Sequence, residues 1–299
     1  MTIADIAKEL YFERPKSVLY HYTSLDGMNG IVKDKSLWAT DIRYFNDAAE
    51  MRHTAELVRS EIARRLEREG SNQRLLEQFR EWLFDRLTEG HMVFVASFTA
   101  NGNLLSQWRG YCPHGRGVSL GFHPEKIAKY ADNQLFKIAR CVYDVAQQQQ
   151  LVTRVVDAVE SLGWDRGENA DVSKRHPSNS YYDLFEEIEG GLLSIAALLK
   201  HSSFKEEQEW RAVFPITKNY AEVPYTYRVG PSMLVPYIGF SLVQGADDPL
   251  EFQHVYLGPT PNINLSMSSL SRYLTKKNVG DKDGITYCQI PYREEFKSR

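Results

Sequence analysis

Residues 91–99, HMVFVASFT, form a nearly continuous apolar run in which β-branched and aromatic side chains predominate. A strand with one solvent-facing side alternates apolar and polar residues, whereas a strand that is buried on both faces is apolar throughout. The run therefore predicts a central strand that is covered on both sides.

Helical patterns surround this strand on both sides in the sequence. Apolar residues recur at helical spacing through 47–89, where the opposite face is rich in Arg and Glu, and again in two stretches within 145–201. The predicted strands between them do not alternate evenly with helices, and neither a Rossmann fingerprint nor a phosphate loop is found in the sequence. We therefore expect an α+β fold, a single domain over residues 1–299 with a curved or split sheet and helical insertions at about 47–89 and 145–201.

The composition is that of an ordinary soluble chain and excludes only the extreme classes of protein, so that binding of nucleic acid stays possible. The 36 basic and 39 acidic residues give a net charge of -3, which provides no global field for nucleic acid. Cys112, Cys141 and Cys288 lie far apart, and Cys112 with His114 is only a fragment of a metal site, so we expect neither disulfides nor a structural metal. The first residues do not resemble a secretory signal and no apolar run is long enough to span a bilayer. The expectation is a cytoplasmic protein that does not contact membranes.

The segment 204–214, FKEEQEWRAVF, places acidic residues directly before a predicted strand. Apolar and other residues alternate from Glu209 onward, which is typical of a strand. If the strand extends back to Glu207, the Glu207 and Glu209 carboxylates lie on one side of it, roughly 7 Å apart. The alternative interpretation is a solvated acidic turn.

Two further pairs of residues are candidates for ligand binding, because they lie at strand ends or on short connections, where ligand-binding residues are often found. His21 and Tyr22 end a predicted strand just before a helix. Trp108 and Arg109 lie on a short element between two predicted strands. The alternatives are a core position for Trp108 and a surface ion pair for Arg109.

Residues 117–121, GVSLG, match the G-x-S-x-G pattern of a hydrolase nucleophile elbow. An elbow requires a serine at a sharp turn between a strand and a helix. Here Val118, Leu120 and Phe122 alternate through the motif, which predicts that Ser119 lies within a strand. The serine-hydrolase interpretation is therefore disfavoured.

Several segments together resemble one family. These are LYHYTSLDGMNGIVKDKSLWATDIRYFND, SFTANGNLLSQWRGYCPHGRGVSLGF, EEQEWR and the late HVYLGPT with IPYR. In this order they resemble the bacterial and phage proteins grouped as domain of unknown function 2971, from about residue 18 to residue 293.

The chain is also similar, more remotely, to ADP-ribosyltransferases, especially the diphtheria-toxin-like and DNA-modifying groups. That resemblance implies that His21 holds the adenosine-side ribose of NAD and that Thr40 supports the second motif beside Trp38. It makes Glu209 the catalytic acid and puts Glu207 at the acceptor-recognition position. Tyr22, where a glycine is common, competes with Tyr44 and Trp108 for stacking on nicotinamide.

The residue types also suit this chemistry without the resemblance. Breaking the nicotinamide–ribose bond passes through an oxocarbenium-like cation, which a carboxylate stabilises. An aromatic face suits nicotinamide, and Arg109 suits the pyrophosphate through a bidentate contact.

The expected function is that of an ADP-ribosyltransferase-like enzyme that consumes NAD to modify a macromolecule, either nucleic acid or protein. Such an enzyme would act as a toxin or phage-defence effector, with an antitoxin or defence-system partner. Two alternatives stay open: an NAD glycohydrolase, and a non-catalytic module that binds a nucleotide or protein through Trp108–Arg109 and Glu207–Glu209.

Overall fold

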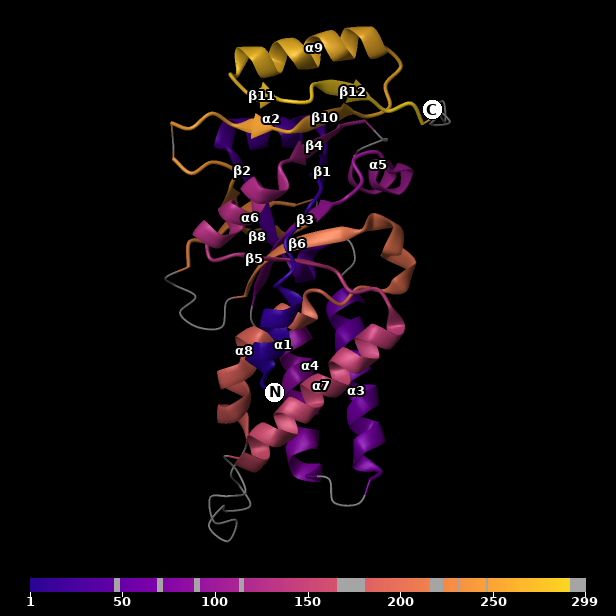
Figure 1. The fold of residues 1–299 in the computed structure, drawn as a ribbon, viewed down its shortest axis with the longest axis vertical. Coiled ribbons are helices and arrows are strands. Elements are labelled where there is room, and N and C mark those ends of the chain that lie inside the picture. Colours follow the sequence, from indigo (N-terminus) through magenta and orange to yellow (C-terminus); the bar gives the residue numbers. More distant parts are fainter. Residues whose placement is uncertain are drawn as a thin grey trace.

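A mixed, open β-sheet stands above a bundle of helices in the computed structural model, which describes residues 1–45, 49–68, 72–88, 92–112, 116–165, 181–215, 223–230, 232–245 and 247–290 (Figure 1). The predicted α+β class is confirmed. Whether the chain forms a single domain stays a prediction.

The main sheet runs in the order β12-β10-β4-β1-β3-β2-β8-β7. Neighbouring strands on this path are antiparallel apart from β10 and β12, which are parallel. The bounds are β12 (Ile285–Tyr287), β10 (His254–Leu257), β4 (Val118–Phe122), β1 (Leu19–Thr23), β3 (Val93–Thr99), β2 (Ser36–Asp41), β8 (Leu234–Ser241) and β7 (Thr226–Val229). β9 (Glu251–Phe252) and β11 (Gly280–Asp281) form a separate small sheet.

The central strand β3 has a different arrangement on each edge. Along one edge it pairs over its whole length with β6 (Glu209–Pro215), which in turn pairs with β5 (Lys137–Arg140). On the other edge, β1 pairs only at Thr99, whereas β2 pairs only at Phe94 and Val95. The strands β1 and β2 therefore part from each other along residues 96–98 of β3, and we call this region the fork.

The prediction for the segment 91–99 is confirmed over the residues that form β3; His91 lies outside the described residues. Val93 and Val95 belong to the core shared with the helical bundle. Phe94, Ala96 and Phe98 belong to a second core on the opposite face. Because both faces are covered, an uninterrupted apolar run is favoured at this position.

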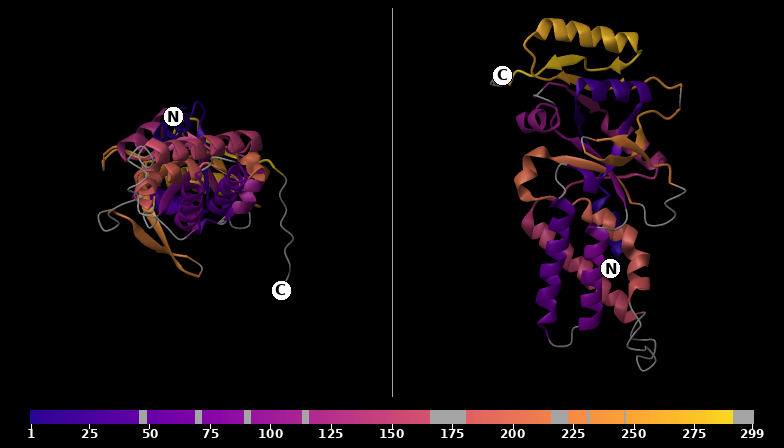
Figure 2. Two further views of the ribbon diagram at one scale, coloured as in Figure 1. Left: turned by 90° about the horizontal axis from the view of Figure 1, so that it is seen from below. Right: turned by 180° about the vertical axis from the view of Figure 1, so that it is seen from behind.

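Five helices form the bundle below the sheet, and Figure 2 shows the same arrangement from behind. They are α1 (Ile3–Leu10), α3 (Ala49–Leu66), α4 (Gln73–Thr88), α7 (Val145–Gly163) and α8 (Tyr182–Ala196). Phe79 on α4 and Phe185 on α8 are fully buried in the core of this bundle, with ring centroids 5.3 Å apart. α3 and α4 lie within the range predicted for the first helical insertion, and α7 and α8 within that predicted for the second.

The remaining helices lie around the sheet. They are α2 (Leu25–Asp34), α5 (Leu105–Tyr111), α6 (Pro124–Asn133) and α9 (Ile263–Lys276), with short 3₁₀ helices η1 (Ile42–Tyr44) and η5 (Ser202–Glu207). The α2 helix begins directly after Ser24, whose hydroxyl caps it by accepting a hydrogen bond from the Gly27 amide. Within the described residues, none of the helices is long and apolar enough to span a bilayer.

The surroundings of Ser119 and Glu207 bear on two local predictions. Ser119 lies in the middle of β4, opposite Tyr22 on β1 and Tyr256 on β10, as the alternation predicts. The strand does not extend back to Glu207. β6 begins at Glu209, because Gln208 has a left-handed backbone with φ of 44°. Glu207 instead ends η5.

Candidate functional site

A cavity of about 990 Å³ lies at the fork, bordered by β1, α2, β2, α5, η5 and the first residues of β6. Its volume is in the range of about 300–1,000 Å³ that is usual for small-molecule sites. Six of the predicted site residues contribute to its lining: His21, Tyr22, Thr40, Tyr44, Glu207 and Glu209.

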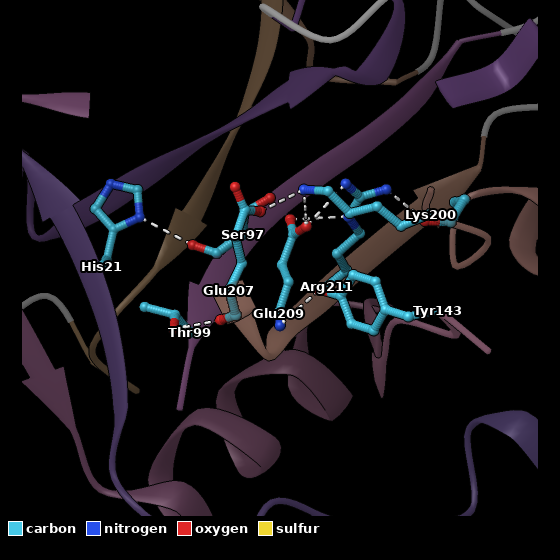
Figure 3. A network of polar contacts seen from close by, with 9 residues as sticks. His21, Ser97, Thr99, Tyr143, Lys200, Glu207, Glu209 and Arg211 are labelled. Atoms are coloured by element: carbon cyan, nitrogen blue, oxygen red, sulfur yellow. Dashed lines mark hydrogen bonds and ion pairs between the residues drawn. The ribbon is translucent and has the colours of Figure 1, made fainter. Parts of the chain in front are cut away.

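Four charged side chains form a cluster at the start of β6 (Figure 3). The ammonium of Lys200 lies 2.6 Å from a carboxylate oxygen of Glu207 and 2.6 Å from one of Glu209. The guanidinium of Arg211 grips Glu209 with two contacts, Nε at 2.9 Å from Oε1 and Nη2 at 3.0 Å from Oε2. We call Lys200, Glu207, Glu209 and Arg211 the charge cluster.

Hydrogen bonds to backbone and hydroxyl groups hold the cluster in place. Arg211 Nη1 donates to the Ala197 carbonyl oxygen just beyond α8, at 2.7 Å. The Glu209 amide donates to the Tyr143 hydroxyl oxygen at 2.9 Å, and the Thr99 hydroxyl donates to the Glu207 carbonyl oxygen at 2.5 Å. The carboxylates of Glu207 and Glu209 thus meet at Lys200 although no continuous strand connects the two residues.

Glu209 is charged at neutral pH in this environment. Burial by itself raises the pKa of its carboxyl group, but the positive charges of Arg211 and Lys200 outweigh burial and lower this pKa to about 2. Both carboxylate oxygens are engaged by cations. The electrostatic field that Glu209 exerts on a ligand is therefore strongly compensated.

His21 lies on β1, beside the open edge of β3. Its Nδ1 is 3.0 Å from the Ser97 carbonyl oxygen, and because a carbonyl only accepts, Nδ1 carries the proton and Nε2 is the acceptor. Burial lowers the pKa of His21, an effect that the Ser97 contact partly offsets. A neutral imidazole with an acceptor nitrogen suits a hydroxyl-bearing ligand such as a ribose.

Aromatic side chains on the β2 side of the cavity are partly open to solvent. Trp38 is 47% exposed and Tyr44 is 38% exposed, and both line the cavity. The Trp38 ring lies 4.9 Å from that of Tyr237, at 39°. Thr40, two residues along the same strand, is buried in the lining.

Trp108 and Arg109 lie outside the cavity lining, and Tyr22 lines the cavity but packs on Trp108. Trp108 is fully buried, donates from its indole nitrogen to Asn103 Oδ1 at 3.0 Å, and is not in the cavity lining. Tyr22 packs edge-to-face on Trp108 at 4.7 Å, and its hydroxyl donates to Asn101 and accepts from the Leu104 amide. Arg109 is exposed on α5 and also lies outside the lining. Trp108 and Arg109 thus do not share the cavity with His21. The indole of Trp108 instead supports β1 from the core cluster that it shares with Tyr22.

Sequence reasoning missed the two cations of the charge cluster. Lys200 follows the apolar face of α8, and Arg211 lies between Trp210 and Ala212 in a strand that is otherwise apolar beyond Glu209. A charged residue at a position predicted to be buried almost always has a partner of opposite charge. That rule could have connected Arg211 with Glu209.

Among the residues that the structure describes, no group of three or more His, Cys, Asp or Glu side chains is arranged to hold a metal ion, and His114 lies outside that part.

Comparison with known proteins gives a match to one family model over part of the chain, and the description of that family names no activity. The model of a family described as "Protein of unknown function (DUF2971)" matches residues 107–212, the part of the chain from α5 to β6 that contains the whole charge cluster. This match supports the resemblance to that family. Neither the curated proteins nor the solved structures gave a match.

Proposed function

We propose that the cavity at the fork binds NAD and that the chain is an ADP-ribosyltransferase-like enzyme, which modifies a nucleic acid or protein as a toxin or phage-defence effector. One observation carries the proposal. His21 on β1, Thr40 on β2 and the pair Glu207–Glu209 at the start of β6 come from three distant segments and line one cavity. These are the residue types, in the same order along the chain, that the resemblance to ADP-ribosyltransferases implies.

The proposed chemistry breaks one bond and forms another. The nicotinamide–ribose bond breaks, nicotinamide leaves with the bonding electrons, and the ribose carbon takes on cationic character that nearby carboxylates stabilise. A nucleophilic group of the acceptor then bonds to that carbon, and Glu207 takes its proton as a general base. In this proposal His21 Nε2 accepts a hydrogen bond from a ribose hydroxyl, and Trp38 or Tyr44 supplies the apolar face for a ring.

A binding module without catalysis is the second candidate, and the charge cluster favours it. Because Lys200 and Arg211 engage both oxygens of Glu209, much of the negative potential that would stabilise a cation is already compensated. Such a cluster can serve instead to shape a pocket for a nucleotide that is bound and released unchanged.

Nicotinamide release decides between the candidates. The purified full chain is incubated with NAD, with and without cell extract, while nicotinamide is quantified by chromatography and acceptor labelling is followed with tagged NAD. We expect release in the presence of extract and a loss of about 10²- to 10³-fold in Glu209→Asp, in which the carboxylate is withdrawn by one methylene. Glu56→Gln, at an exposed site on α3, is the control and should keep full activity.

Glu207→Ala separates the acceptor role from ribose chemistry. Acceptor labelling should fall by about 10²-fold or more while slow hydrolysis of NAD by water persists. Release without any labelling would indicate an NAD glycohydrolase. NAD binding without release would establish the binding module, and an absence of both binding and release would contradict the NAD assignment altogether.

A further inference from the structure

Arg228 is the third basic residue that lines the cavity, and its surroundings differ from those of the other two. It lies on β7, opposite Val235 of β8, and its guanidinium carbon is 5.5 Å from the centre of the Trp38 ring on β2. The arginine thus reaches across β8 to the aromatic side of the cavity. A separation of less than about 6 Å places the cation on the ring in an attractive geometry.

The donors of Arg228 have no acceptor in the described part of the chain. Its Nε is buried and makes no hydrogen bond there, and none of the ion pairs found in that part includes this residue. Lys200 and Arg211, by contrast, are engaged by Glu207 and Glu209. Within the described lining, Arg228 is therefore the cation that is available for an anionic ligand.

The physical chemistry of arginine indicates which kind of anionic group Arg228 would bind. A guanidinium packed against an aromatic ring has less freedom to turn its planar fork of donors, and that fork matches the oxygens of a phosphate in a bidentate contact. Leaving a buried donor such as Nε unpaired costs free energy, which an acceptor from a ligand restores. The neighbouring Trp38 and Tyr44 provide apolar faces for the rest of a nucleotide.

We propose that Arg228, laid on Trp38, binds a phosphate of the nucleotide that occupies the cavity. This inference rests on the proposed function only in taking a nucleotide as the ligand, and it holds whether or not the nucleotide is cleaved. It assigns to Arg228 the phosphate contact that the sequence suggested for Arg109.

Equilibrium binding tests the assignment without any turnover. Titration calorimetry with ADP-ribose, adenosine and inorganic pyrophosphate compares ligands with and without phosphates on the full chain. In Arg228→Gln, we expect the affinity for ADP-ribose to fall about 10- to 100-fold, because a charge-assisted hydrogen-bond pair is lost. The affinity for adenosine should stay unchanged, and Arg228→Lys should recover only part of the loss because an ammonium lacks the planar fork.

Arg272→Gln is the matched control, since it removes the same charge from an exposed position on α9. It should bind ADP-ribose as the wild type does. Should Arg228→Gln fold poorly, quenching of tryptophan fluorescence by ADP-ribose in the wild type, and its loss in Trp38→Phe, tests the same subsite. Equal ADP-ribose affinity in wild type and Arg228→Gln would overturn the proposal, as would a wild type that binds neither ADP-ribose nor pyrophosphate. A failure to release nicotinamide would overturn the proposed enzyme activity but not this contact.

Discussion

Glu209 is held by its neighbours more tightly than a catalytic carboxylate needs to be. Two buried cations surround it, and each would be left partly uncompensated if the carboxylate were removed. The cost of breaking such a cluster is much greater than the net contribution of the intact pairs, because a buried charge without a partner has lost its hydration. The charge cluster therefore has a structural role whatever its role in chemistry.

Glu209→Gln should accordingly destabilise the fold, by about 3–5 kcal/mol, in contrast to the intact folding expected for an acid exposed at a strand end. Urea unfolding at neutral pH measures the loss. The control Glu56→Gln concerns a carboxylate that is 61% exposed and should change stability by no more than about 0.5 kcal/mol. A similarly small effect of Glu209→Gln would mean that the cluster does not hold the fold.

The difference in stability between wild type and Glu209→Gln should depend on pH. The folded-state pKa of Glu209 is lowered from 4.5 to about 2, so the stabilisation is complete above pH 4.5 and declines as the pH falls through that interval. Unfolding curves of both proteins at a series of pH values should therefore converge toward pH 2. A difference that stays constant from neutral to acidic pH would show that the carboxylate charge is not its source.

At the scale of elements, the glycines of the GVSLG segment have a packing role instead of a catalytic one. A Cβ at Gly121 would lie 2.8 Å from the Tyr20 ring and 2.9 Å from the His254 carbonyl oxygen. A Cβ at Gly117 would lie 2.3 Å from the Thr23 carbonyl oxygen. Both glycines let neighbouring strands and rings approach β4 closely, which explains the motif without an elbow.

Gly121→Ala should therefore cost about 1–3 kcal/mol through overpacking. Gly110→Ala on α5 is the comparison, because a Cβ there meets no atom within 4 Å and alanine favours the helix. Thermal unfolding should show a lower midpoint for the first variant and an unchanged or higher one for the second. Equal midpoints would contradict the close packing between β1, β4 and β10.

Elements with a strong local period could be predicted closely from the sequence, and their partners could not. The helices α7 and α9 follow their apolar spacing, and β3 follows its apolar run. Nothing in these periods indicates that β6 pairs with β3 or that β1 and β2 part along it, because pairing is decided by contacts between distant segments. His21, Thr40 and Glu209 could be chosen as candidates from their sequence context and the family resemblance. Arg228 could not, because its place in the cavity depends on the pairing of β7 with β8 and of β8 with β2.

At the scale of the whole molecule, the strand β3 connects two cores. One of its faces contributes to the core of the bundle and the other to the core of the sheet. Arg211 adds a polar link, since it joins β6 to the backbone just beyond α8. Loss of either core removes support from the strand on which the fork is built.

We therefore expect the bundle and the sheet to unfold together. In urea, the transitions followed by far-ultraviolet circular dichroism and by tryptophan fluorescence should coincide. Phe79→Ala, in the bundle core, should shift both transitions together by an amount corresponding to about 3–5 kcal/mol. Two separate transitions, with only the helical signal affected by the substitution, would instead indicate two independent domains.

The cavity at the fork is proposed above all as a site for NAD, and a crystal structure of the full chain soaked with NAD can check this claim. We predict the adenosine-side ribose within hydrogen-bond distance of His21 Nε2, a phosphate on Arg228 beside Trp38, and the nicotinamide ribose next to Glu209 and Glu207. An NAD molecule bound elsewhere, or an empty cavity in crystals soaked at a concentration that saturates binding in solution, would contradict the claim.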